Sequence, residues 1–417
     1  MRTADPPAAS ARDLLRQRDY LHFWASRWMG SLAIQIQSVA MGWQVYDISR
    51  RAHLSVDVAS FNVSLIGLIT FAPLFFLALP AGMTADRYDR RRIMSICYFG
   101  ELIPSAILAS AELFGFASVP LLLGVAVIFG TSRAFFSPAA TALGPMLVPR
   151  ELLPRAIAWN SLAGQFASIA GPAVAGLLLT VAPGLAFEVS FGLSLAALVS
   201  IAFIRGQTAP KAQAGSRWAL VKEGLAYVWS EKLVFGAISL DLAAVILGGA
   251  TALLPAFARD VLKVGPEGFG LLRAAPSAGA AVVALMLATR PIRSRAGVKM
   301  LSGVAVYALA TIVFSLSRSV WLSVAALATL GAADMLSVFV RQTLVQLVTP
   351  DPMRGRVAAV SSLFISASNE LGEFRGGLVA RFLGPVAAVL YGGIGALAVT
   401  GVWARFFPAL RKADRLE

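Results

Sequence analysis

The residues with the clearest chemistry are ionisable side chains that lie inside long apolar stretches. Arg133, Asp334 and Glu370 each lie deep within such a stretch. A charge in the hydrocarbon of a bilayer costs several kcal/mol unless it is paired or hydrated, so each of the three is a candidate functional group. Asp334 is the first candidate for a carboxylate that carries a proton or binds a cationic substrate.

Two alternatives remain for each of the other deep charges. Arg133 either forms a fixed ion pair that holds helices together or tunes the proton affinity of a nearby carboxylate. Glu370 and Glu373 share a helical face at a spacing of three residues, where two carboxylates repel each other and favour holding a proton. The alternative is that Asn369 and Glu370 hydrogen-bond to a neighbouring helix and only join the two helices.

Other polar residues lie closer to the ends of the apolar stretches, and reaching polar surroundings by snorkelling explains them equally well: Arg27, Glu101, Asp241 and Arg273. Gln37 and Gln44 are seven residues apart and share a helical face. We expect both amides to line a substrate cavity. Trp43 and Tyr46 fit either that wall or an interfacial aromatic belt.

The chain lacks the patterns of an enzyme. It has 2 His and 1 Cys, and no nucleophile–base or metal-ligand spacing occurs. No phosphate-binding loop of the Gly-Lys-Ser/Thr kind is present, so ATP hydrolysis is not the expected energy source. The sequence therefore predicts no enzymatic activity, no metal and no cofactor.

The composition is that of a membrane protein. Of 417 residues, 58% are hydrophobic and 14% are charged, against about 25% charged in soluble domains. A span needs about 20 mainly apolar residues, which predicts an all-α protein of twelve transmembrane helices. The predicted spans are 21–48, 57–83, 93–115, 119–143, 157–181, 185–204, 234–258, 268–289, 298–317, 320–343, 357–382 and 385–407.

The positive charges indicate an orientation rather than a nucleic-acid partner. With the N-terminus inside, the inner segments hold 25 Lys and Arg residues and the outer segments hold six. This bias predicts cytoplasmic termini. Nucleic-acid binding would instead require the basic residues to gather on one patch.

The chain divides into two similar halves. At an offset of 201 residues, Gly130, Pro149, Arg155 and Ser161 match Gly331, Pro350, Arg356 and Ser362, and Arg133 matches Asp334. Such repeats are typical of secondary transporters whose substrate binds between the halves. The predicted organisation is a cytoplasmic segment at 1–20, a six-helix bundle at 21–204, a linker with an amphipathic helix at 205–233, a second six-helix bundle at 234–407 and a cytoplasmic tail at 408–417.

The loop after the second predicted span, from Gly82 to Arg92, resembles the signature loop of the major facilitator superfamily. The matching positions are Gly82, Asp86, Arg87, Arg90 and Arg91, whereas Asp89 stands where a glycine is usual. The resemblance implies the major facilitator fold, with two pseudo-symmetric six-helix bundles. It also implies that this loop acts as a conformational latch, with Asp86 meeting the start of helix 11 near Val357.

Two further segments indicate a narrower relationship. Gly171, Pro172 and Gly176 in the fifth span are similar to the packing motif of drug:proton antiporters, and Arg133 resembles their buried arginine. Gly130–Ala139 and Thr349–Val357 resemble the enterobactin-exporter and transmembrane-secretion-effector branch. The rocker-switch arrangement that this resemblance implies would place Arg27, Arg133, Asp241 and Asp334 around one water-filled space.

The expected function is secondary active transport by alternating access. The leading hypothesis is proton-coupled export of a small organic molecule, such as a drug-like compound or a siderophore, by a monomer in the bacterial inner membrane. Its partners would be that substrate, protons and the lipid bilayer. The alternatives are an uncoupled lipid or lysolipid transporter, which a pH gradient would not affect, and a non-transporting membrane sensor with the same fold.

Overall fold

The computed structural model of the chain describes residues 11–206, 208, 217–290, 292 and 294–412. These residues form helices and connections without strands. The first half contains the long helices α2 (Arg18–Arg51), α3 (Val56–Arg87), α4 (Arg90–Phe114), α5 (Val119–Leu143), α6 (Leu153–Val181) and α7 (Leu185–Ala202). The second half contains α9 (Lys232–Gly248), α11 (Pro266–Thr289), α12 (Ala296–Leu316), α13 (Val320–Val348), α14 (Arg354–Leu383) and α15 (Pro385–Phe406).

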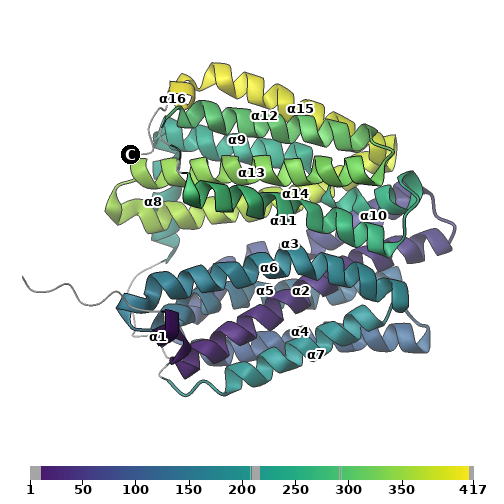
Figure 1. Cartoon of the computed structure of the whole chain (residues 1–417), viewed down its shortest axis with the longest axis horizontal. Helices are drawn as coiled ribbons and strands as arrows, with labels where there is room; N and C mark the ends of the chain where they lie inside the picture. Colours follow the sequence, from purple (N-terminus) through teal and green to yellow (C-terminus); the bar gives the residue numbers. More distant parts are fainter. Residues whose placement is uncertain (1–10, 207, 209–216, 291, 293, 413–417) are drawn as a thin grey trace, which may run out of the picture.

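Three of the shorter helices lie at one end of the molecule. Figure 1 shows α1 (Ala11–Leu15), α8 (Arg217–Ser230) and α16 (Pro408–Lys412) at its left-hand side. We call this the termini end, and we call the other end, which carries the α2–α3 connection at 52–55, the opposite end. The short turns η1 (Gly144–Leu147), η2 (Arg150–Leu152) and η5 (Asp351–Met353) precede α6 and α14. The predicted segments at 1–10 and 413–417 lie outside the described residues.

Two bundles of helices lie side by side in Figure 1, one built from α2–α7 and the other from α9 and α11–α15. They meet mainly where α3 packs against α14 and α6 packs against α11. Within the described residues, ten helices are long and apolar enough to span a membrane. The two other long helices, α2 and α14, are less apolar, and both carry polar residues into the space between the bundles.

The repeat that the sequence shows at Gly130 and Gly331 corresponds to two similar helix crossings. A methyl group on Gly130 of α5 would lie 2.4 Å from the Thr70 carbonyl oxygen of α3. A methyl group on Gly331 of α13 would lie 1.9 Å from the Pro276 carbonyl oxygen of α11. Glycine therefore allows the backbones to approach closely at equivalent places in the two bundles.

The seventh predicted span, at 234–258, lies within the candidate membrane span Lys232–Val261, but it is not one continuous helix. Helix α9 ends at Gly248, and the chain continues through η3 (Thr251–Leu253), α10 (Leu254–Ala256) and η4 (Phe257–Val261). Gly249 lies so close to Gly372 of α14 that a methyl group there would be 2.5 Å from the Gly372 carbonyl carbon. Arg375 of α14 donates a 2.7 Å hydrogen bond to the Leu247 carbonyl oxygen, which satisfies a backbone acceptor at the break.

The connection between the halves is attached to both of them. The Asp19 carboxylate of α2 accepts hydrogen bonds from the backbone of Arg205 and Gly206. On the other side of the connection, Glu223 of α8 pairs with Arg356 of α14. The linker helix that the sequence predicts is present as α8, although residues 209–216 before it lie outside the described part of the chain.

Candidate functional site

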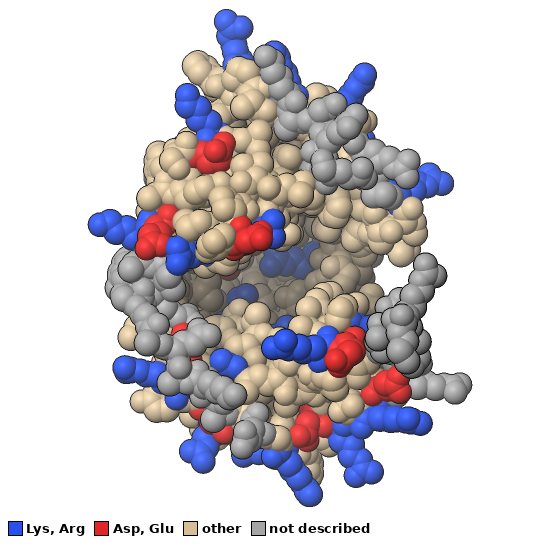
Figure 2. Space-filling view, turned by 90° about the vertical axis from the view of Figure 1, so that its left-hand side faces the viewer, with Lys and Arg blue, Asp and Glu red and all other residues tan. Residues whose placement is uncertain are grey.

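A cavity lies between the two bundles at mid-height. Its inner part, which we call the chamber, comprises about 830 Å³ of non-atom space, open solvent included, and is lined by residues of α2, α3, α5, η3, α10, α11 and α14. Its outer part, the vestibule, adds about 1140 Å³, including the open mouth. The two parts share four residues, Ile34, Gln35, Arg133 and Glu370. Figure 2 looks onto the termini end and shows the hollow between the halves, with Lys and Arg atoms inside it.

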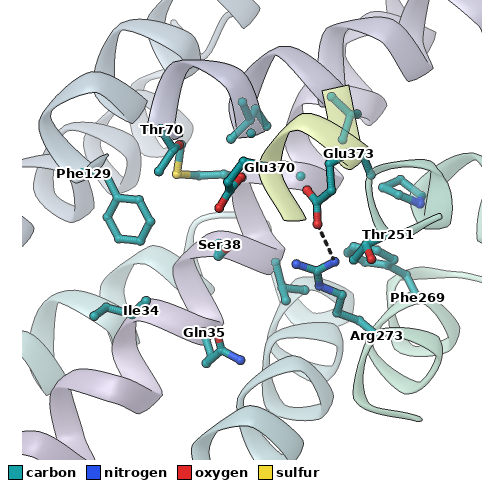
Figure 3. A pocket seen from close by; sticks show the side chains of 18 of the residues that line it. Ile34, Gln35, Ser38, Thr70, Phe129, Thr251, Phe269, Arg273, Glu370 and Glu373 are labelled. Atoms are coloured by element: carbon teal, nitrogen blue, oxygen red, sulfur yellow. Dashed lines mark ion pairs between the residues drawn. The ribbon is translucent and has the colours of Figure 1, made fainter. Parts of the chain in front are cut away.

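Two glutamates of α14 and one arginine of α11 project into the chamber (Figure 3). Arg273 and Glu373 form an ion pair with 3.7 Å between Nη1 and Oε1. Glu370 forms no such pair with the described residues. A methyl group on Gly67 of α3 would lie 3.2 Å from Glu370 Oε2, so the Glu370 carboxylate reaches across to the first bundle.

Two arginines line the cavity from the first bundle. Arg133 of α5 borders both the chamber and the vestibule, and its guanidinium lies 5.7 Å from the centre of the Phe129 ring. Arg27 of α2 lines the vestibule, donates to Asn160 Oδ1 at 3.3 Å and lies 5.5 Å from the centre of the Phe136 ring. Both cations therefore border the vestibule.

Asp241 and Asp334 lie elsewhere, which corrects the expectation of one shared space. They line a separate small pocket inside the second bundle, together with Tyr307 and Ser337. Arg341, whose side chain is 1% exposed, pairs with Asp241 at 3.3 Å. Both aspartates therefore border a space between α9, α12 and α13. A role for Asp334 in coupling stays a prediction.

Gln37 and Gln44 also do not line the cavity. Both side chains are buried in the first bundle, and Gln37 Oε1 accepts a 2.5 Å hydrogen bond from Ser105 of α4. The cavity face of α2 instead carries Arg27, Ser31, Gln35 and Ser38. Gln35 is two positions from Gln37, so the two amides point to nearly opposite sides of the helix. Gln37 and Gln44 share a helix face, as predicted, but this face packs against α4 and not against the cavity.

Glu101 of α4 is buried behind the cavity. It is 1% exposed, and neither of its carboxylate oxygens has a hydrogen-bond partner among the described residues. Such a group is costly to hold in its charged form. Snorkelling, which the sequence allowed for Glu101, does not occur in this conformation.

The cavity is closed at the opposite end by contacts between the halves. Asp260 of η4 pairs with Arg50 of α2 at 3.0 Å and accepts a 2.5 Å hydrogen bond from the Tyr46 hydroxyl. Next to them, Asp47 of α2 pairs with Arg51 at 2.6 Å and also with Arg259 of η4. We call these five charged residues and Tyr46 the opposite-end gate. Sequence reasoning missed the gate, although acids beside bases at two span ends were a visible signal.

Trp43 and Tyr46 belong to this closure rather than to an interfacial belt. Tyr46 is 1% exposed and Trp43 is 9% exposed. The Trp43 ring stacks on Phe269 of α11, with 5.5 Å between ring centres. Aromatic burial therefore adds to the ion pairs in holding the two halves together at this end.

The predicted latch loop lies at the termini end. Arg90 donates to the carbonyl oxygens of Ala85 and Ala142, both at 3.2 Å, and Arg91 donates to the Ile204 carbonyl oxygen. These bonds all stay within the first bundle. Gly82 is buried and Arg87 is exposed. The meeting of Asp86 with the start of α14 stays a prediction.

Asp89, the departure from the usual loop pattern, has a structural explanation. Its carboxylate caps α4 by accepting from the backbone of Arg91 and Arg92, and it accepts a 2.6 Å hydrogen bond from Thr208. Burial acts to raise the pKa of Asp89, but the hydrogen bonds from Thr208, Arg92 and Arg91 outweigh it and lower the pKa below its ordinary value. The aspartate therefore joins the loop to the linker.

Replacing Asp89 by alanine is expected to destabilise the protein by about 1 kcal/mol, the usual effect of losing a helix N-cap. Because the folded-state pKa is depressed, the carboxylate stabilises the protein above the ordinary aspartate pKa, and this contribution is lost as the pH falls through the folded pKa. Thermal unfolding of Asp89→Ala and Asp89→Asn in detergent across pH measures both effects. Asn keeps the cap but removes the titrating charge, so Ala should lower the midpoint at neutral pH more than Asn does; equal midpoints for the two variants would contradict the capping role.

The predicted helix-packing motif lies where α6 crosses α2 and α11. A methyl group on Gly171 would lie 2.5 Å from Gln35 Cβ of α2, and one on Gly176 would lie 2.9 Å from Gly270 Cα of α11. The Pro172 carbonyl oxygen would be 2.5 Å from a methyl group on Gly270. The small residues therefore allow α6 to pack closely within its own bundle and across the interface.

Comparisons with known proteins agree with this architecture. The sequence model of the transmembrane secretion effector family matches residues 9–417. The multidrug efflux pump Tap of Mycobacterium tuberculosis is 25% identical over 373 residues, which cover 85% of this chain and 86% of the pump. The enterobactin exporter EntS of Escherichia coli is 26% identical over 352 residues, covering 82% of each protein.

Solved structures show the same fold. A bacterial homologue of the human lysosomal transporter Spinster, in an inward-facing and unoccupied conformation, superposes with a TM-score of 0.70 at 16% identity, covering 97% of this chain and 100% of that one. A D-xylose–proton symporter gives a TM-score of 0.70 at 14% identity, covering 94% of this chain and 99% of the symporter. The chain therefore belongs to the transmembrane secretion effector family and is a multi-pass membrane transporter of the major facilitator fold, not an enzyme.

Proposed function

We propose that the protein exports a small organic molecule from the cytoplasm by alternating access, driven by protons that move inward. The observation that carries this proposal is the cavity between the bundles, which is open at the termini end and closed at the opposite end by the gate. Its chamber is lined by both bundles and combines apolar, aromatic and charged side chains, as small-molecule sites commonly do.

The direction of transport follows from the orientation that we propose. The inner segments hold 25 Lys and Arg residues and the outer segments hold six, which favours a cytoplasmic termini end. In a bacterial inner membrane the described conformation would then load substrate from the cytoplasm. The names of the relatives, a multidrug efflux pump and an enterobactin exporter, support export. We propose that a monomer suffices, because the cavity is formed by one chain.

Glu370 is the carboxylate that we assign to proton coupling. It lines the chamber and the vestibule, and it makes no ion pair with the described residues, whereas Glu373 pairs with Arg273. Arg133, Arg273 and Glu373 are the charged groups that act on it. A proton that binds Glu370 from one side of the membrane can leave to the other side once the cavity changes its exposure.

The experiment uses everted membrane vesicles that contain the protein and maintain an acidic interior. A growth screen in an efflux-deficient host first identifies a compound to which the protein confers resistance. Adding that compound to the vesicles should release part of the pH gradient, because each substrate molecule that enters the vesicle exchanges for protons. A fluorescent pH indicator measures the release, and vesicles without the protein serve as the control.

Two outcomes would contradict the proposal. If the compound accumulates at the same rate after a protonophore collapses the gradient, transport is not proton-coupled. If no compound in the panel is transported, while fluorescent lipid moves between leaflets whatever the pH gradient, the protein is a lipid transporter.

A further inference from the structure

The two walls of the cavity carry opposite charge. The wall formed by the first bundle contains Arg27 and Arg133 and no acidic residue. The wall formed by the second bundle contains Glu370, Glu373 and Arg273. Since Glu373 and Arg273 pair with each other, Glu370 is the remaining charge on that side. The cavity therefore has a positive face and a negative face.

The guanidinium groups on the positive face have N–H donors that make no hydrogen bond with the described residues. Arg133 makes no hydrogen bond or ion pair within the described part of the chain, and its guanidinium lies 5.7 Å from the centre of the Phe129 ring. Arg27 uses Nε to reach Asn160, and its guanidinium lies over Phe136. Each guanidinium has five N–H donors in a planar fork, which suits a carboxylate or a similar planar anion.

The negative face carries a carboxylate, that of Glu370, which has no ion-pair partner among the described residues. Glu370 reaches across the chamber toward α3 near Gly67, and Figure 3 shows its carboxylate in the cavity, apart from the Arg273–Glu373 pair. The charged groups that face it are Glu373 of its own helix, Arg133 of α5 and Arg273 of α11, while α3 contributes Gly67 and Thr70, which are uncharged. A carboxylate in this place can accept either a proton or a substituted ammonium group.

Between the charged faces the walls are apolar and aromatic. Phe129 and Phe269 line the chamber, with Val63 and Ile66 of α3 beside them. Gln35, Ser38 and Thr251 add hydrogen-bonding groups. A substrate that fills this space needs an apolar or ring-bearing body, because such a body recovers the hydrophobic gain of burial without leaving polar groups unpaired.

We propose that the cavity binds zwitterionic molecules, with the anionic group held by Arg27 and Arg133 and the ammonium group held by Glu370. This inference rests on the proposed export function and names its substrate class. It also explains how substrate could be exchanged for a proton, because the ammonium group and the coupling proton compete for the Glu370 carboxylate. A purely anionic substrate would bind best when Glu370 is protonated. The substrate and the proton would then bind together, whereas exchange requires each to displace the other. A purely cationic substrate would leave both guanidiniums without a partner.

Four probes that share one body separate the two charges: 2-naphthylalanine, its C-terminal amide, its N-acetyl derivative and the N-acetyl amide. They are respectively zwitterionic, cationic, anionic and neutral. Equilibrium dialysis against the purified full-length protein in nanodiscs at neutral pH measures binding. We expect the zwitterion to bind at least about tenfold more tightly than each singly charged probe, since a charge-assisted hydrogen bond contributes about 1.5–3 kcal/mol.

The variants assign each charge to its face. Glu370→Gln should remove the advantage of the zwitterion over the N-acetyl derivative and keep its advantage over the amide. The double variant Arg27→Gln with Arg133→Gln should do the reverse. Glu151→Gln, at an exposed position of η2, is the matched control and should change neither ratio. Equal binding of the four probes, no binding of any, or preference for a singly charged probe overturns the proposal.

The outcomes also separate this inference from the export function. If the zwitterion binds best but is not moved by a pH gradient in vesicles, the export proposal fails and the charge pattern of the site remains. If the vesicles transport compounds of one charge sign better than matched zwitterions, export stands and the substrate class is wrong.

Discussion

Replacing Glu370 by glutamine is expected to reduce proton-driven transport to the level of vesicles without the protein. The amide keeps the size of the side chain but cannot exchange a proton, and it cannot attract a cationic group as a carboxylate does. Glu370 is the cavity carboxylate without an ion-pair partner among the described residues, so no other lining group can replace it. Substrate-induced release of the pH gradient in everted vesicles measures the effect.

The same variant should lose the pH dependence of substrate binding. In the wild type, protons compete with substrate, so affinity should fall as the pH is lowered; in Glu370→Gln it should stay constant. Glu151→Gln, which alters an exposed carboxylate at the termini end, is the control. If Glu370→Gln transports normally and Asp334→Asn does not, coupling belongs to the pocket inside the second bundle instead.

Neutralising Asp260 and Arg259 together is expected to open the opposite end of the cavity. The double variant Asp260→Asn with Arg259→Gln removes both ion pairs that join α2 to η4, and it weakens the hydrogen bond from Tyr46. These groups are partly exposed, so each pair contributes about 0.2–1 kcal/mol rather than the full Coulomb energy. Together with the weakened Tyr46 hydrogen bond, which contributes about 0.5–1.5 kcal/mol, the combined loss is about 1–3 kcal/mol, which shifts a two-state equilibrium by about 5–150-fold.

Distances between spin labels measure this shift. Ala52→Cys and Ser319→Cys place one label on each half at the opposite end, and both positions are exposed. Cys97→Ser removes the single native cysteine. We expect a population at longer distance in the double variant. Asp351→Asn, which neutralises an exposed acid at the termini end, should leave the distance unchanged. An unchanged distance in the double variant as well would show that the ion pairs do not hold the gate.

Much of the fold could be predicted because the signals for spans are local. A run of about 20 apolar residues predicts a spanning helix, and each predicted span overlaps one of the twelve long helices, although the seventh span continues beyond the end of its helix at Gly248. The break in that helix depends on contact between Gly249 and Gly372 and on the hydrogen bond from Arg375. Gly248 and Gly249 were visible in the sequence, but the partners that hold the break were not.

The cavity residues were harder to predict because a sequence shows which residues share a helix face but not what that face meets. Gln37 and Gln44 share a face that packs against α4, while Gln35 points into the chamber. Asp241 and Asp334 lie on helices expected to border the cavity, yet both border a space between α9, α12 and α13. Arg133 and Glu370 line the cavity, and both interrupt apolar runs on faces that meet the other half.

The gate is a clear case of information that only the tertiary structure holds. Asp47 and Arg259 are separated by more than half of the chain, and each has a charged neighbour in sequence that offers a simpler local pair. Their meeting depends on the break that redirects the chain after α9. For this reason the sequence indicates only interfacial charges at the opposite end, whereas the structure shows that these residues join the two halves.

The central claim, that the cavity opens to the cytoplasm and changes sides, is tested most directly by labelling Ser38→Cys in a Cys97→Ser background. Ser38 lines the chamber, and a membrane-impermeant thiol reagent is added to right-side-out or everted vesicles. His53→Cys at the opposite end and Arg150→Cys at the termini end, both exposed, mark the two faces of the membrane. We predict that Ser38→Cys reacts from the cytoplasmic face, and that adding Asp260→Asn and Arg259→Gln makes it react from the outer face. Reaction only from the outer face before the gate is altered, or from neither face in both proteins, would contradict the account.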